Sequence, residues 1–160
     1  MPDLRLIKAA DEGTKMTTSL ITDQHLAQFQ ADGYTVCPAF FDPHELAALR
    51  AELERFKREG LGRNVATDDK SALMRALPFA PKVVDAITRL IGAPFVRQLD
   101  QIFLKPGRTG AGTDWHTDNA YFRISDPTKG TAMWVALQDA TLANGTLHVI
   151  PRSFLETYEH

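Results

Sequence analysis

The spacing of apolar residues changes along the chain, and this change constrains the fold more than any other feature. Before Gly92, apolar side chains recur at helical intervals, as Leu46, Leu49 and Leu53 do, which is typical of amphipathic helices. After it come short apolar runs bounded by turn residues, such as 131–137, which are typical of strands. Helices followed by strands predict an α+β fold.

Three helices are expected in the first part of the chain. Thr22 can cap a helix that Gly33 ends. Asp42-Pro43-His44-Glu45 predicts a second start, because Asp caps, Pro suits the first turn and Glu can reach back to the cap. That helix is expected to end at Gly60, and a third to cover 81–91. The residues of the third helix expected to face inward are Val84, Ile87 and Ile91.

Strands are expected in the second part. Phe95 to Leu104 predicts one strand, and the Gly-rich stretch 105–112 predicts a loop after it. Residues 131–137 and 146–150 predict two further strands, with Asn144-Gly145 as the turn between them.

Composition narrows the function. The chain has 160 residues and a net charge of −2, which argues against a nucleic-acid or anionic-membrane partner. No apolar run is long enough to span a membrane. The single cysteine, Cys37, suits a reducing cytoplasm. The length predicts one domain, which we expect over 21–160, after a flexible arm at 1–20.

His116 and Asp118 are the residues most suggestive of chemistry. Two residues apart on a strand, they would point to the same face. An imidazole and a carboxylate side by side form two-thirds of the facial triad that holds Fe(II) in oxygenases. The tripeptide alone favours an ordinary His–Asp pair at a polar strand end over a metal site.

Several longer segments occur in an order that resembles one known family. They are Asp32-Gly-Tyr-Thr-Val36, Phe41-Asp-Pro-His-Glu-Leu46, Phe103-Leu-Lys-Pro-Gly107, Trp115-His-Thr-Asp-Asn-Ala-Tyr121, Met133-Trp-Val-Ala-Leu-Gln-Asp-Ala-Thr141 and Asn144-Gly-Thr-Leu-His-Val-Ile-Pro151. Together they resemble the phytanoyl-CoA dioxygenase family of Fe(II)- and 2-oxoglutarate-dependent oxygenases, from about Thr22 to Ser153.

The resemblance implies a hydroxylase that uses Fe(II), 2-oxoglutarate and O₂ on a small organic or acyl substrate. It also implies helices followed by a partial double-stranded β-helix, or jelly roll. The residues whose roles the resemblance implies are His116 and Asp118 as iron ligands, Gln101, Lys105 and Trp134 around oxoglutarate, and Asn119 and Tyr121 beside the substrate. Trp134 could equally be a core residue, and Lys105 a solvated loop residue.

The chain departs from the family pattern near its end. Arg152 stands where the family usually has Gly, so this loop is expected to differ locally. The family's second iron histidine and its oxoglutarate-anchoring arginine have no counterpart after Asp118, so the domain looks incomplete at its C-terminus. An incomplete sheet leaves an open edge that a second copy can cover.

Two alternatives therefore stay open at this point. The chain could be a shortened, non-catalytic homologue that acts as a binding or oligomerisation module. Alternatively, His148 or His160 of a partner chain could complete the metal site.

Overall fold

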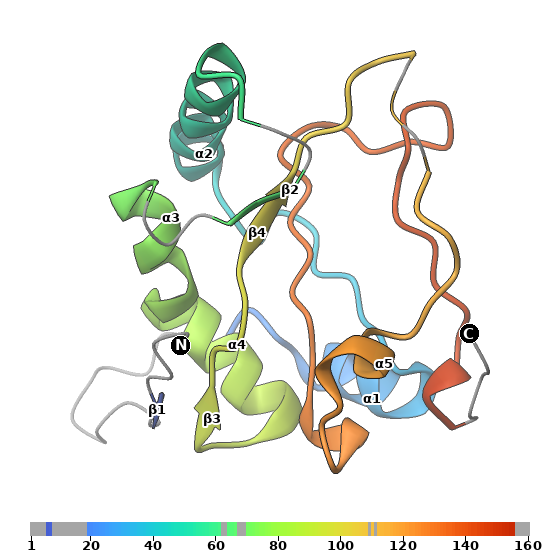
Figure 1. The fold of residues 1–160 in the computed structure, drawn as a ribbon. Helices are drawn as coiled ribbons and strands as arrows, with labels where there is room; N and C mark the ends of the chain where they lie inside the picture. The colour runs from blue at the N-terminus through green and yellow to red at the C-terminus, as the bar shows by residue number, and fades with distance from the viewer. Residues whose placement is uncertain are drawn as a thin grey trace.

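The protein is described from a computed structural model, which covers residues 6–7, 19–61, 64–66, 70–108, 110 and 112–155. Figure 1 shows helices along one side of the molecule and long extended segments along the other. The helices are α1 (Asp23–Asp32), α2 (Pro43–Arg58), α3 (Ala72–Ala76), α4 (Pro81–Ile91) and α5 (Asp118–Phe122), and the strands are β1 (Leu6–Ile7), β2 (Asn64–Ala66), β3 (Phe95–Val96) and β4 (Gln101–Phe103). None of the described helices is long and apolar enough to cross a membrane.

The ends of α1 and α2 confirm the predicted caps. The Thr22 hydroxyl accepts a hydrogen bond from the His25 amide, and Gly33 ends α1 in the left-handed conformation at φ +83°. At α2, the Asp42 carboxylate accepts from the Glu45 amide and the Glu45 carboxylate accepts from the Asp42 amide, each at 2.8 Å. This reciprocal capping box satisfies amides that the first turn leaves without an intrahelical partner.

Helix α4 has the predicted bounds, but a different face is buried. Val83 and Ala86 are the buried residues, whereas Val84 and Ile91, which were expected inside, are half-buried. Ile87 does pack against the core. The inward face lies about one residue round the helix from the expected one, and it includes the small side chain of Ala86.

The core is built from the helices and from the segments that connect them. One cluster of buried residues brings α4 against the residues before α1 and before α2. Phe56 of α2 is fully buried, and Leu49, two helical turns earlier on the same face, is buried as well. The members of the cluster are Ile21, Phe40, Phe41, Val83 and Ala86.

Two short antiparallel ladders replace the single strand expected over 95–104. Strand β3 pairs with β1, and β4 pairs with β2. Between β3 and β4, Arg97 and Asp100 form a 2.9 Å ion pair, and residues 97–100 belong to neither ladder. Strand β2 lies between the second and third helices expected from the sequence, where no strand was expected. The rest of the expected arm, at 1–5 and 8–18, lies outside the described residues.

The strands expected at 131–137 and 146–150 are absent from the described part of the chain. Both segments are described, and no ladder joins them to another described segment. The Asn144-Gly145 turn does form, with Gly145 at φ +88°. A strand exists only through backbone pairing with a neighbour, so apolar patterning alone did not produce the jelly roll. The observed class is mixed α and β.

Candidate metal centre

His116 and Asp118 lie side by side, although not on a strand. His116 ends an extended stretch, and Asp118 is the first residue of α5. The His116 Nε2 atom lies 3.4 Å from the Asp118 Oδ1 atom. The expected neighbourhood is therefore present, but a change from extended to helical backbone creates it.

The other ring nitrogen of His116 is held by the main chain. Its Nδ1 atom lies 2.8 Å from the carbonyl oxygen of Asp114. Because a carbonyl can only accept, Nδ1 carries a proton in this bond, which leaves Nε2 as the ring nitrogen available to a metal beside Asp118. Metal-binding histidines commonly have this arrangement, in which a carbonyl or carboxylate fixes the ring. The Asp114 carbonyl could not be found from sequence, because every residue carries the same main-chain atom.

The donor atoms of His116 and Asp118 are of the kinds that bind a divalent metal, but there are only two of them. An imidazole nitrogen and a carboxylate oxygen are two of the three donors in the facial triad that binds Fe(II). Among the described residues, no group of three or more His, Cys, Asp or Glu side chains could hold a metal.

The two residues expected beside the substrate both lie in α5. The Tyr121 ring stands edge-on to the His116 ring, with centroids 5.7 Å apart, and is 72 % exposed. The Asn119 amide bonds to the main chain of Ile124, donating from Nδ2 at 3.2 Å and accepting at Oδ1 at 2.7 Å. Tyr121 is thus open to a ligand, whereas the polar atoms of Asn119 are already engaged.

The three residues expected around oxoglutarate lie on other segments. Gln101 begins β4, and Lys105 lies two residues beyond its end, on the same exposed side of the alternation. The Lys105 ammonium lies 3.5 Å from the Thr113 hydroxyl, on the other side of the Gly-rich loop. Thr113 is three residues before His116 in the sequence. Trp134 is 47 % exposed. Their roles toward oxoglutarate stay predictions.

The residues considered near the end of the chain have other surroundings. The His148 ring stands edge-on to Trp115, with centroids 6.4 Å apart. His160 lies outside the described residues. Arg152 adopts φ +66°, the left-handed region that the family's glycine favours, and its amide donates to the Asp32 carbonyl at 2.7 Å. The expected local difference is therefore a change of side chain on the same type of backbone conformation.

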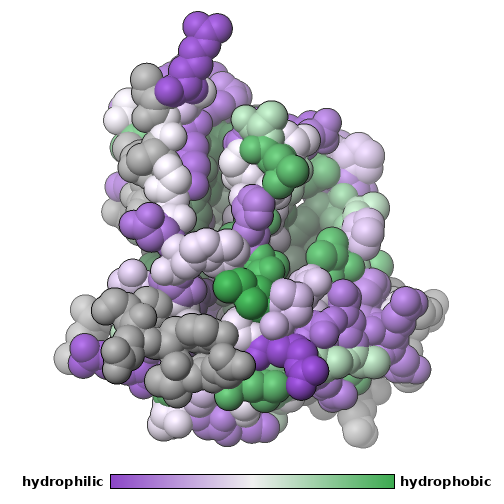
Figure 2. Space-filling view, turned by 90° about the vertical axis from the view of Figure 1, so that its right-hand side faces the viewer, coloured by the Kyte–Doolittle hydropathy of each residue, from purple (hydrophilic) through white to green (hydrophobic). Residues whose placement is uncertain are grey.

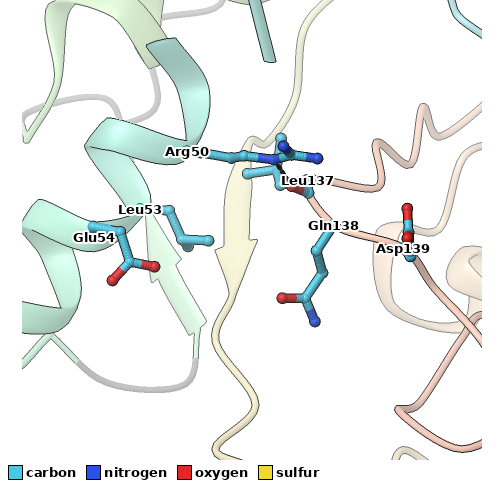
Figure 3. Close-up of a pocket in the computed structure, with 6 residues that line it drawn as sticks. All are labelled: Arg50, Leu53, Glu54, Leu137, Gln138 and Asp139. Carbon is cyan, nitrogen blue, oxygen red and sulfur yellow. Dashed lines mark hydrogen bonds between the residues drawn. The ribbon is translucent and has the colours of Figure 1, made fainter. Parts of the chain in front are cut away.

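Two cavities lie elsewhere, and neither is lined by a predicted site residue. One of about 1000 Å³ lies among α2, α3 and α4. The other, of about 560 Å³, lies between α2 and the extended segment 137–139 (Figure 3). At its edge the Arg50 Nε donates to the Leu137 carbonyl. Arg50 was expected on a solvated face, and it instead ties α2 to the last part of the chain.

Known proteins match most of the chain. The profile of the family described as Phytanoyl-CoA dioxygenase (PhyH) matches residues 29–157. An ectoine dioxygenase of Stutzerimonas stutzeri is 28 % identical over 152 residues, which cover 83 % of this chain and 50 % of that protein. A phytanoyl-CoA dioxygenase of Arabidopsis thaliana is 45 % identical over 60 residues, 38 % of this chain and 20 % of that protein.

A phytanoyl-CoA dioxygenase domain-containing protein 1 homolog of Caenorhabditis elegans is 38 % identical over 64 residues, covering 40 % of this chain and 22 % of that protein. No solved structure matches the chain. The chain spans about half the length of the ectoine dioxygenases that it matches.

Proposed function

The chain belongs to the phytanoyl-CoA dioxygenase family, and on that premise we propose that it contributes to the catalytic centre of an Fe(II)- and 2-oxoglutarate-dependent hydroxylase. His116 and Asp118 are the proposed iron ligands. Because the matched ectoine dioxygenases are about twice as long, the proposal concerns the activity of a whole protein that includes these residues.

One observation carries the proposal. The His116 Nε2 atom lies 3.4 Å from the Asp118 Oδ1 atom while the Asp114 carbonyl holds Nδ1. Two metal ligands at right angles, each about 2.1 Å from the ion, lie about 3 Å apart. The pair therefore needs only a small adjustment to bind one ion.

Iron in such a site supplies oxygen activation when 2-oxoglutarate and O₂ bind at its open positions. The chain's own residues would orient these partners. Lys105 carries a positive charge suited to a carboxylate of oxoglutarate, and Gln101 and Trp134 would line the same pocket. Tyr121, exposed and beside His116, would meet a small organic or acyl substrate.

The remaining parts of the site follow from the family premise. A facial triad requires a further donor, and a carboxylate is commonly anchored by a bidentate arginine. We propose that both come from a jelly roll to which the segments 131–137 and 146–150 contribute strands. On this view 21–160 is the first part of the domain and 1–20 precedes it as an arm. We place the protein in the cytoplasm, without nucleic-acid or membrane partners.

Metal titration tests the proposal directly. Co(II), a stable substitute for Fe(II), is titrated into the 160-residue chain by calorimetry, and His116→Ala and Asp118→Ala are each expected to weaken binding at least tenfold. His44→Ala, at an exposed position in the first turn of α2, is the matched control and should bind as the original chain does. Equal binding by all four proteins would contradict the assignment.

The same titration separates the proposed site from one completed between chains. His148→Ala and His160→Ala are expected to leave both affinity and stoichiometry unchanged. If the original protein instead bound one Co(II) ion per two chains, and either variant changed that ratio, the result would support a ligand from a second copy. Formation of succinate from 2-oxoglutarate, dependent on added Fe(II), is the corresponding activity measurement for the whole protein.

A second candidate function is an oligomerisation module. It is favoured by the exposed apolar side chains of the last segments, such as Met133, Leu147 and Ile150. Figure 2 shows hydrophobic residues around a hollow on this side of the molecule. Exposed apolar patches commonly mark interaction surfaces. Light scattering on the purified chain distinguishes the candidates: a stable dimer without Co(II) binding supports the module, and a monomer contradicts it.

A further inference from the structure

We propose that Asn119 is a positioning residue, whose side-chain amide holds α5 in the orientation that places Asp118 and Tyr121 beside His116. The inference rests on the proposed function for the identity of the bound ion. The placement of the three side chains is a property of the protein alone and can be measured without any metal.

The contacts of Asn119 form a clamp across the end of α5. The amide bonds twice to the main chain of Ile124, five residues later, by donating to its carbonyl oxygen and accepting from its N–H. Asn119 also uses its own carbonyl oxygen, which accepts from the Arg123 amide at 2.9 Å. Three hydrogen bonds from one residue therefore close the loop that follows the helix.

Helix α5 needs such a restraint. It has five residues, none of them buried, whereas an isolated helix of this length is unstable in water. Its C-terminal residue is followed by Arg123 in the left-handed conformation at φ +52°. A non-glycine residue is disfavoured in that region, so the clamp has to stabilise a turn that the sequence does not favour.

The position of Asn119 makes the clamp relevant to the metal centre. Asp118 directly precedes it and Tyr121 follows two residues later, whereas His116 belongs to the extended stretch before the helix. Any rotation of α5 therefore moves Asp118 and Tyr121 together relative to His116. The clamp thus sets both the 3.4 Å separation of His116 from Asp118 and the ring contact with Tyr121.

Replacing the amide by an apolar group of similar size tests the role. Asn119→Leu is expected to weaken Co(II) binding by the 10–100-fold typical when a residue that supports metal ligands is lost. Asn119→Gln keeps the amide but extends it by one methylene, so it should fail to reach Ile124 and weaken binding similarly. The Co(II) affinity is measured by calorimetry on the 160-residue chain.

Asn144 provides a matched control. Its amide clamps another loop in the same way, donating to the Asp139 carbonyl and accepting from the Thr141 amide, both at 2.6 Å. Asn144→Leu removes the same chemistry away from α5 and is expected to leave Co(II) affinity unchanged. A similar loss of affinity in Asn144→Leu would overturn the proposal, because the effect would then reflect general loosening.

A second measurement without metal keeps the two proposals separable. Nuclear Overhauser contacts between the His116 and Tyr121 rings are expected in the original chain and in Asn144→Leu, and are expected to be lost in both Asn119 variants. Retained contacts with unchanged Co(II) affinity overturn the positioning role. If the contacts are lost but His116→Ala binds Co(II) normally, the positioning role holds and the proposed metal site fails.

Discussion

The two parts of the molecule differ in how they treat apolar side chains. We refer to 19–91 as the helical region and to 92–155 as the extended region. Within the described residues, all eight buried hydrophobic side chains belong to the helical region, whereas thirteen of the sixteen exposed large hydrophobics belong to the extended region. Both regions have apolar residues, so the difference lies in packing rather than in composition.

Backbone hydrogen bonding explains the difference. A helix satisfies its amides and carbonyls within one segment, so α2 and α4 can form first and then pack their apolar faces together. A strand is satisfied only by a neighbour, and the segments at 131–137 and 146–150 have none in the described structure. Side-chain amides of Asn119 and Asn144 instead close the loops of the extended region.

The two regions are expected to differ most in how much the free energy of unfolding changes when a large side chain is truncated. Phe56 is fully buried in the helical region, and Leu142 is 82 % exposed in the extended region. Phe56→Ala is expected to lower the free energy of unfolding by about 3–5 kcal/mol, through lost burial and a cavity. Leu142→Ala should change it by less than about 0.5 kcal/mol, as exposed sites usually do.

Urea denaturation followed by helical circular dichroism measures both variants. Comparable losses of stability in the two would contradict the comparison, because they would mean that the extended region buries Leu142 in solution.

A substitution where the two regions meet is expected to lower stability by an amount between those of the two truncations. Gly33 lies at φ +83°, and a Cβ atom added there would lie 2.5 Å from the Phe154 ring. Gly33→Ala is therefore expected to cost about 1–2 kcal/mol for the left-handed backbone, together with displacement of the ring. Thermal unfolding followed by circular dichroism measures the loss.

The double variant Gly33→Ala/Phe154→Ala separates the two causes. The double variant should remove the clash with the Phe154 ring but keep the cost of the left-handed backbone at position 33. If Gly33→Ala were as stable as the original chain, Phe154 would not pack on α1, and the extended region would be less firmly attached than the structure indicates.

Acidification is expected to act on the helical region with the smallest effect. Hydrogen bonding to Lys82 lowers the pKa of Glu45, and the Glu45 amide lowers the pKa of Asp42. A carboxylate with a lowered folded-state pKa stabilises the fold above its unfolded-state pKa, which is near 4. That stabilisation is lost as the pH falls through the folded-state pKa.

The thermal midpoint, followed by helical circular dichroism, should therefore decline as the pH is lowered from about 5 to 3. Glu45→Gln is expected to reduce the midpoint at neutral pH and to flatten the decline. Glu54→Gln, which removes only an exposed pair with Lys57, is the matched control. An undiminished slope in Glu45→Gln would show that this carboxylate does not link the start of α2 to Lys82.

Prediction from sequence succeeded where a local rule was sufficient. The cap at Asp42, the stop at Gly33 and the bounds of α4 all follow from interactions within a few residues. It failed for α3, which is five residues long and too short for a repeat of apolar residues to be recognised. It also failed for β2, because a three-residue strand depends entirely on β4.

The candidate site divides in the same way. The sequence indicated that His116 and Asp118 belong together, and the structure brings them together by a route that alternation along a strand did not anticipate. The contacts that orient them come from the Asp114 carbonyl and the main chain of Ile124. Main-chain groups have no sequence signature, so only the folded backbone could identify them.

The sequence by itself determined the family, the longer helices and the pairing of His116 with Asp118 as candidate donors, because these depend on residue type and on spacing along the chain. The tertiary structure alone decided which face of α4 is buried, how Asn119 is used and whether the later apolar segments become strands. Those outcomes depend on which groups meet in space, and pairing between distant segments is set by the neighbours that are present rather than by local pattern.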